Sequence, residues 1–340
     1  MPNSSVYSGK EFSVYISHDD TTSGVGTFNS NTSSEWNAVD IDSFSFPSFN
    51  PTQEFEMRTG SGRIAPFASV FASEKGVVRE VTLAGRLTDE VLQIFAENVL
   101  GEANDSGDIG CAYNHAPSTL TDGGTVTSGD YSSALSVYFK SPVSGKSWKL
   151  AGAVCTSFNI SADMGTAGGR FNFSATLQTG YAPTSGDISG FSAPSISSTK
   201  IYLSNMTTKS LTDNTTGGFT EIDPLISTFG LTMAGSAQML GMQGSAGEPE
   251  VIARLVPELE ITYEMALKYA SDTAPLIEEY KSTDQDIACA LSGTGFGVDI
   301  AKSKLTQAEL DPGDIAGLNV AGKMLAPSSG DAFTLTVSDS

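Results

Sequence analysis

The chain has 340 residues and a formal net charge of −21, because 39 Asp and Glu outnumber 18 Lys and Arg. This length suits about two domains that each bury a core, and the acidic excess argues against binding to a phosphate backbone, which depends on Lys and Arg. The three cysteines are far apart, so no disulfide framework is expected, and no apolar run reaches the roughly 20 residues of a membrane span. We therefore expect a soluble protein that is made in a cytoplasm and has no membrane partner.

The first strands are predicted over residues 11–17, 39–46 and 77–87, where apolar and β-branched residues cluster. A helix is predicted to begin after Thr88, because its hydroxyl can accept a hydrogen bond from a free backbone amide of the first turn. Asp89 suits the positive end of such a helix. We expect the apolar stripe of this helix to pack on a sheet.

A segment rich in Gly, Ser, Asp and Thr follows over residues 102–131 and has no counterpart later in the chain. Long segments of this kind are mostly functional contacts or disordered, and the sequence does not separate the two. Residues 171–177 then alternate between apolar and polar, which predicts a half-buried strand. The same alternation predicts a strand over Phe333–Val337.

The most regular predicted strand covers residues 257–269, and a helix is expected to follow over 273–281. Alternation along the strand places Glu258, Glu260 and Glu264 on one face and apolar residues on the other. Two interpretations stay open. The strand belongs either to an ordinary sheet with one solvated face or to a sheet whose polar face lines something.

The chain shows weak similarity between its two halves. Ile41 and Ile226 each begin a similar apolar run, 185 residues apart (226 − 41). A repeat this long indicates duplicated domains, because solenoid repeats span only about 20 to 50 residues. We predict a first domain over residues 1–182 with 102–131 as an insertion, a linker of small residues over 183–198, and a second domain over 199–340. The alternative is that two β-rich domains share similar patterns by chance.

Catalytic motifs are missing from the sequence. Its two histidines, His18 and His115, both lie in polar stretches that we expect to be loops, and no zinc-binding spacing, Walker A or nucleophile-elbow pattern occurs. Residues 293–297 superficially resemble a nucleotide-binding loop but lack its third glycine and following helix, so a turn between strands is predicted. We expect no enzyme activity, no cofactor and no bound metal; a hydrolase without a recognisable motif is the remaining enzymatic alternative.

The apolar strand at 41–46, the strand and helix over 77–100 and the strands within 150–180 have later counterparts. This arrangement resembles the tail tube (major tail) proteins of tailed bacteriophages. The resemblance covers most of the chain, although the family has no invariant signature. It implies a mainly β, α+β fold of two tandem tail-tube domains, each a β-sandwich or barrel-like domain with a flanking α-helix.

The resemblance also implies a structural virion protein with no catalytic role. Such proteins stack as rings around a channel, here acidic, through which DNA passes during ejection without specific binding. Two tandem domains suit a trimeric, pseudo-hexameric ring whose partners are further copies of the chain and other tail proteins. The location would be a virion tail assembled in the host bacterial cytoplasm. The alternative is a virion decoration protein or a host-surface-binding β-domain protein.

Acidic residues on alternating strand positions are the channel-lining candidates under this hypothesis. They are Glu54, Glu56, Glu80, Glu258, Glu260 and Glu264. The Gly-rich segments 59–76 and 243–250 are expected to be loops that stack rings or contact neighbouring subunits and that order on assembly. No catalytic, cofactor-binding or metal-binding residue is assigned.

Overall fold

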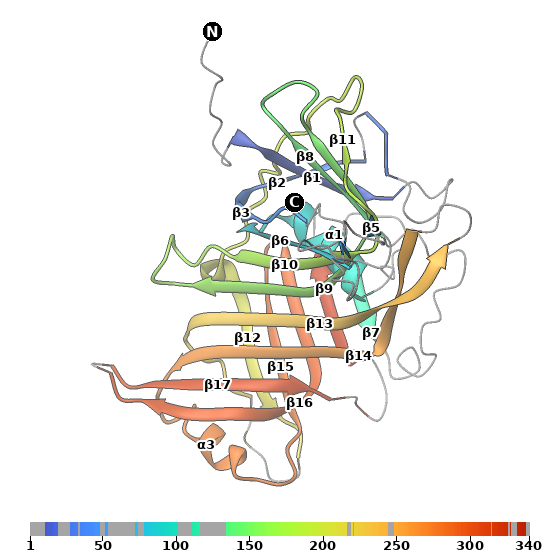
Figure 1. Ribbon diagram of the computed structural model, residues 1–340. Coiled ribbons are helices and arrows are strands. Elements are labelled where there is room, and N and C mark those ends of the chain that lie inside the picture. Colours follow the sequence, from blue (N-terminus) through green and yellow to red (C-terminus); the bar gives the residue numbers. More distant parts are fainter. Residues whose placement is uncertain are drawn as a thin grey trace, which may run out of the picture.

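The structure is a computed structural model that describes residues 11–19, 28–32, 35–47, 52–53, 72–73, 78–100, 111–115, 134–215, 219, 221–243, 248–313, 315–325, 327 and 332–337. Within these ranges the protein is mainly β (Figure 1). One antiparallel sheet holds 16 strands, and a second sheet holds the two short strands β4 and β5. Each half of the chain also contributes one described α-helix.

The elements of the first half are β1 (Ser13–His18), β2 (Asn37–Val39), β3 (Ile41–Phe44), β4 (Thr52–Gln53), β5 (Ala72–Ser73), β6 (Arg79–Arg86), α1 (Asp89–Leu100), β7 (Cys111–His115), β8 (Leu135–Lys140), β9 (Trp148–Asp163), β10 (Asn172–Thr179) and β11 (Thr184–Ser185). The elements of the second half are β12 (Met206–Asp213), β13 (Ile226–Gln243), β14 (Glu248–Lys268), α3 (Pro275–Tyr280), β15 (Ile287–Gly293), β16 (Phe296–Asp311), β17 (Gly317–Met324) and β18 (Phe333–Val337).

Most of the predicted elements are confirmed. Helix α1 begins after Thr88, whose Oγ1 accepts a hydrogen bond from the backbone N–H of Val91 at 3.4 Å. The predicted turn at residues 293–297 connects β15 to β16, and Gly295 has the positive φ of 81° that favours glycine. The strand predicted over 39–46 is interrupted at Asp40 and forms β2 and β3 instead.

One expectation about loops is wrong, and two further segments contain short strands. His18 and His115 lie in strands, as the last residues of β1 and β7. Strand β7 falls inside the segment 102–131 and pairs with β18, the last described strand. Because its partner strand is so far away in the sequence, the residues of β7 alone do not reveal this pairing. The segment 183–198, predicted as a linker, contains β11, which pairs with β9.

Eight neighbouring strands form what we call the central sheet. Their order is β3, β6, β10, β9, β13, β14, β17 and the C-terminal part of β16. The first four belong to the first half of the chain and the last four to the second half. Strands β9 and β13 pair directly, so the two halves share one sheet.

The same pairing scheme occurs twice along the chain. β1 pairs with β8, β8 with β9, β9 with β10, and β10 with β6, which also pairs with β3. In the second half β12 pairs with β15, β15 with β16, β16 with β17, and β17 with β14, which also pairs with β13. The short β11 pairs with the start of β9, as β18 does with the start of β16.

Three interruptions of strand register also correspond between the halves. The shifts between Ile41 and Ser43, between Leu135 and Val137, and beside Thr156 in the first half match those between Ile226 and Thr228, between Ile287 and Cys289, and at Thr306 in the second half. The second half has further shifts between Met206 and Thr208 and between Ala234 and Gly241, which have no counterpart among the described pairs of the first half. A bulge bends its strand and re-aims the side chains beyond it. The two halves therefore share three bends of their sheets as well as the order of these strands.

One apolar core lies against the inner face of the central sheet and includes residues of both halves. In Figure 1, β12 and β15 run crosswise to β13 and β14. Phe158 of β9 is fully buried in this core, with its ring centroid 5.1 Å from that of Phe95 in α1 and 6.3 Å from that of Phe173 in β10. Phe158 thus joins the helix to two strands of the central sheet.

Phe158→Ala should lower the free energy of unfolding by about 3–5 kcal/mol, because it removes a buried ring and leaves a cavity between α1 and the sheet. Urea unfolding followed by circular dichroism measures this change. The matched control is Leu225→Ala, at a side chain that is 63% exposed, for which we expect a change within about 0.5 kcal/mol. Equal effects of the two substitutions would contradict the assigned core.

Candidate assembly surface

The outer face of the central sheet is polar and continuous across both halves of the chain. Directly paired residues of antiparallel strands point to the same face. The pairs Thr82–Thr176, Asn159–Thr232 and Thr232–Thr262 therefore lie on one surface that runs from β6 to β14. We call this surface the polar face.

The three strands at the middle of the polar face carry mainly hydroxyl and amide side chains. The positions are Asn172, Ser174, Thr176 and Gln178 on β10, Ser157, Asn159, Ser161 and Asp163 on β9, and Thr228, Gly230, Thr232 and Ala234 on β13. None of these twelve residues is Lys or Arg, and one is an acid. This middle region therefore offers no side-chain cation to a phosphate group.

Three of the predicted channel-lining residues lie on the polar face. Glu80 of β6 is exposed and accepts a hydrogen bond of 3.4 Å from Nε2 of Gln178. Glu260 of β14 is exposed and forms an ion pair of 3.0 Å with Nζ of Lys323. Glu264 is exposed beside Gly230, where a Cβ would come within 2.7 Å of its carboxylate. The structure thus places acids from both halves on one surface.

The other three predicted residues cannot be placed in this way. Glu258 belongs to β14, but its side chain lies outside the described part of the structure. Glu54 and Glu56 lie outside the described residues altogether. The predicted contact segment 59–76 lies outside them too, apart from β5, and segment 243–250 falls at the connection between β13 and β14.

Cations on the polar face were missed by reasoning from sequence. The described acids of this face are Glu80, Asp163, Glu260, Glu264, Glu309 and Asp311, and the described bases are Arg86, Lys268, Lys304 and Lys323. Alternation along 317–324 would have revealed a strand, but only the pairing with β14 shows that Lys323 shares a face with Glu260. The flanks of the polar face therefore carry both signs of charge.

The junction between β9 and β13 joins the two halves through seven paired positions. On the core face, Ile160 pairs with Leu231, and both side chains are fully buried. On the polar face, Nδ2 of Asn159 donates a hydrogen bond of 2.8 Å to Oγ1 of Thr232. The junction is therefore apolar and buried on the core face and joined by a side-chain hydrogen bond on the polar face.

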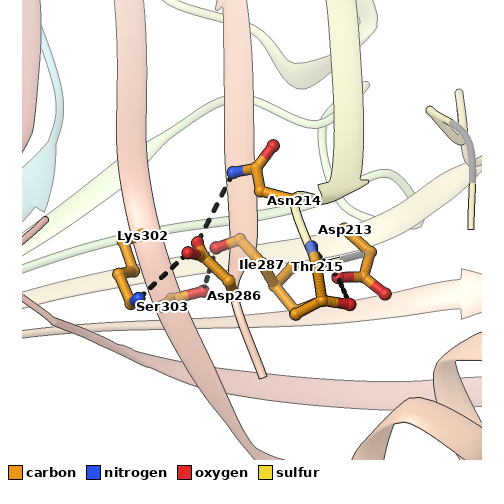
Figure 2. Close-up of polar contacts among 7 residues, drawn as sticks. All are labelled: Asp213, Asn214, Thr215, Asp286, Ile287, Lys302 and Ser303. Atoms are coloured by element: carbon orange, nitrogen blue, oxygen red, sulfur yellow. Dashed lines mark hydrogen bonds and ion pairs between the residues drawn. The ribbon is translucent and has the colours of Figure 1, made fainter. Parts of the chain in front are cut away.

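A second polar cluster lies where β12 ends and β15 begins. Figure 2 shows Asp286 between Lys302 of β16, with Nζ 2.9 Å from its Oδ2, and Asn214, which follows β12. Asp213 is buried, and its Oδ1 accepts hydrogen bonds from the backbone N–H and the hydroxyl of Thr215. This cluster fixes the start of β15 against the neighbouring strands.

Asp213 also faces helix α3. Its Oδ2 and the Oε1 of Glu279 are both buried without a hydrogen-bond partner. Burial raises the pKa of Glu279, and the negative charge of Asp213 raises it further. In the first half, His18 is equivalent to Asp213, because each residue ends the first strand of its pairing scheme. Nε2 of His18 lies 2.9 Å from a carboxylate oxygen of Glu97 in α1. The equivalent strand-to-helix contacts thus differ in chemistry.

Other possible sites among the described residues offer little chemistry. No group of three or more His, Cys, Asp or Glu in the described ranges is arranged to hold a metal ion. An open depression of about 580 Å³ beside α3 is lined by Tyr269, Ser271, Ala274, Pro275, Ile277 and Glu278. Within the described part of the chain, neither helix has the length and apolar character needed to cross a membrane.

Glu279→Gln should make the protein more stable at neutral pH. Because the pKa of Glu279 is higher in the folded chain than in the unfolded chain, the folded chain binds more protons between the two values, and stability falls as pH rises through that window. Glutamine cannot ionise, so the loss of stability with rising pH should be smaller in Glu279→Gln. Urea unfolding between about pH 4 and about pH 7 tests this, with the exposed Glu278→Gln as control. An unchanged pH dependence in Glu279→Gln would contradict the contact.

Comparison with known proteins does not assign this chain to a family. No protein-family model matches the sequence, and a search of curated proteins finds no significant match.

Proposed function

We propose that this chain is the tail tube protein of a bacteriophage, built from two tandem tube domains over residues 1–182 and 199–340 that are joined by 183–198. Each domain would be a β-sandwich with its own flanking helix. Three copies would form a pseudo-hexameric ring, and rings would stack into a tube in the virion tail after assembly in the bacterial cytoplasm. Other tail proteins would bind the ends of the tube.

The observation that supports this proposal is the edge-to-edge joining of two equivalent four-strand sets through β9 and β13. A sheet that grows by a repeated step, and whose strands twist in one direction, curves as it grows. Closure of such a sheet removes its open edges. The chain already contains one step of this kind, so further copies would continue the same sheet around a channel.

The polar face suits the wall of a channel for DNA. Retention of a duplex depends on Lys and Arg that displace counterions from its phosphates. The twelve positions on β10, β9 and β13 include no such residue. Glu260 also pairs with Lys323, which reduces the attraction of that lysine for phosphate. DNA would therefore pass along this surface without specific binding.

Electron microscopy of the purified protein in negative stain tests the assembly. We expect rings or hollow tubes at high protein concentration, because among the described residues β3 and the C-terminal part of β16 each pair with one strand only. A virion decoration protein or a surface-binding β-domain would stay discrete and bind a glycan or protein instead. Particles that remain monomeric at every concentration would overturn the proposal.

The combined variant Glu80→Lys, Glu260→Lys and Glu264→Lys should still form tubes, because all three side chains are exposed. These tubes should retain fluorescent duplex DNA on pelleting at low salt, and the retention should fall steeply as salt rises. Wild-type tubes should retain little. The control variant changes Glu11, Glu221 and Glu278, which are exposed acids outside the polar face, to Lys. Equal retention by the two variants would show that the polar face does not line the channel.

A further inference from the structure

The junction between β9 and β13 has a counterpart at the two ends of the central sheet. Strand β16 holds the place of β9 in the second half, because Thr306 is the extra residue of its bulge, as Thr156 is in β9. Strand β3 holds the place of β13 in the first half, because both shift register directly after an isoleucine, Ile41 or Ile226. Equivalent positions can therefore be counted from these residues.

The two equivalent edges differ in their neighbours. β9 lies between β10 and β13 along its C-terminal part. Among the described residues, the C-terminal part of β16 pairs with β17 and with no second strand. Likewise, the described strand that pairs with β3 is β6. Within the described part of the chain, the central sheet thus ends at β16 on one side and at β3 on the other.

Apolar side chains on the core face are exposed at these ends. Leu310 lies four residues after Thr306, as Ile160 lies four after Thr156. Ile160 is fully buried at the internal junction, whereas Leu310 is 53% exposed. Phe46 corresponds to Leu231, because each lies five residues after its isoleucine. Leu231 is fully buried, whereas Phe46 is 37% exposed although it packs on Phe12, Phe44 and Phe139.

We propose, building on the tube function above, that β3 of one copy, together with Ser45 and Phe46 that follow it, pairs with the C-terminal part of β16 in the next copy, in the register of the internal junction. Leu231 pairs with Ile160 inside the chain, so Phe46 would lie opposite Leu310 of the neighbouring copy. Gly230 pairs with Ser161, so Ser45 would lie opposite Asp311. The partner is a second copy of this chain.

The physical reason is that pairing would satisfy backbone groups and cover apolar side chains at both edges of the sheet. An open sheet edge presents unpaired N–H and C=O groups to any extended strand. Leu310 and Phe46 would add apolar area to the contact, as Ile160 and Leu231 do at the internal junction. The two surfaces are different patches of the chain, so the contact is head-to-tail and repeats until a ring closes.

Cross-linking tests the register directly. The double variant Ser45→Cys and Asp311→Cys places two thiols on the polar face at opposed positions, and Cβ atoms of such pairs lie about 4.5–5.5 Å apart. A short thiol-to-thiol cross-linker should convert most of the protein into covalent multimers on a denaturing gel. Each single variant should stay at the mass of one chain, which controls for the native cysteines.

A matched control uses the internal junction. In the variant Asn159→Cys and Thr232→Cys, the thiols replace side chains that already touch. The same reagent should join them within one chain, so that the mass stays that of a monomer. Reaction of this control together with no multimers from Ser45→Cys and Asp311→Cys, in protein that forms tubes, would overturn the proposed register.

Leu310→Lys tests the contact independently. The side chain is half exposed, so the chain should fold, but a lysine on the core face would be buried without a partner in the contact. We expect an increase of at least about tenfold in the protein concentration needed for tubes, corresponding to about 1.4 kcal/mol. Tyr280→Lys, at a 41% exposed side chain on α3, should leave this concentration unchanged.

The outcomes separate this inference from the proposed function. Tubes that form with Leu310→Lys as readily as with wild type would overturn the inference and leave the tube function standing. Covalent multimers from Ser45→Cys and Asp311→Cys without rings or tubes would support the inference and overturn the tube function. A wild-type protein that never associates would overturn both.

Discussion

Hydrogen bonding between strand edges is the constraint on which this structure depends. Every strand of an antiparallel sheet directs N–H and C=O groups to both sides, and an edge without a neighbour stays open to another extended chain. β13 occupies that edge of β9. As a result, strands from the two halves form one sheet over one apolar core, and Ile160 and Leu231 are shielded from water.

The two halves share geometry more than chemistry. Three of their register shifts fall at equivalent positions, including the bulges at Thr156 and Thr306. Side chains at equivalent places differ, as with the fully buried Phe158 and its counterpart Ala308, two residues after each bulged threonine. A bulge sets the direction of every residue beyond it, so its loss would disturb more contacts than a change of one core side chain. This explains why similarity in sequence is weak while the pairing schemes coincide.

The sequence allowed the local features to be predicted, because their causes are local. The hydroxyl of Thr88 caps the helix that follows it, and alternation over Phe333–Val337 belongs to a strand with one buried face. Long-range pairing left no such signal: neither β7 with β18 nor β9 with β13 could be read from either partner. The same limit applied to the candidate site. Alternation placed Glu260 and Glu264 on one face, but the neighbouring cation Lys323 became visible only with the order of the strands.

The segment between the two halves packs against the first half. After β11, Phe191 packs its ring on Tyr15 and Trp36, and Ile188 is buried beside them. This attachment and the peptide bond together tie each first half to its own second half. Any assembly of this chain therefore contains the two unlike halves in equal numbers, with a stoichiometry fixed at translation and independent of the concentration of either half.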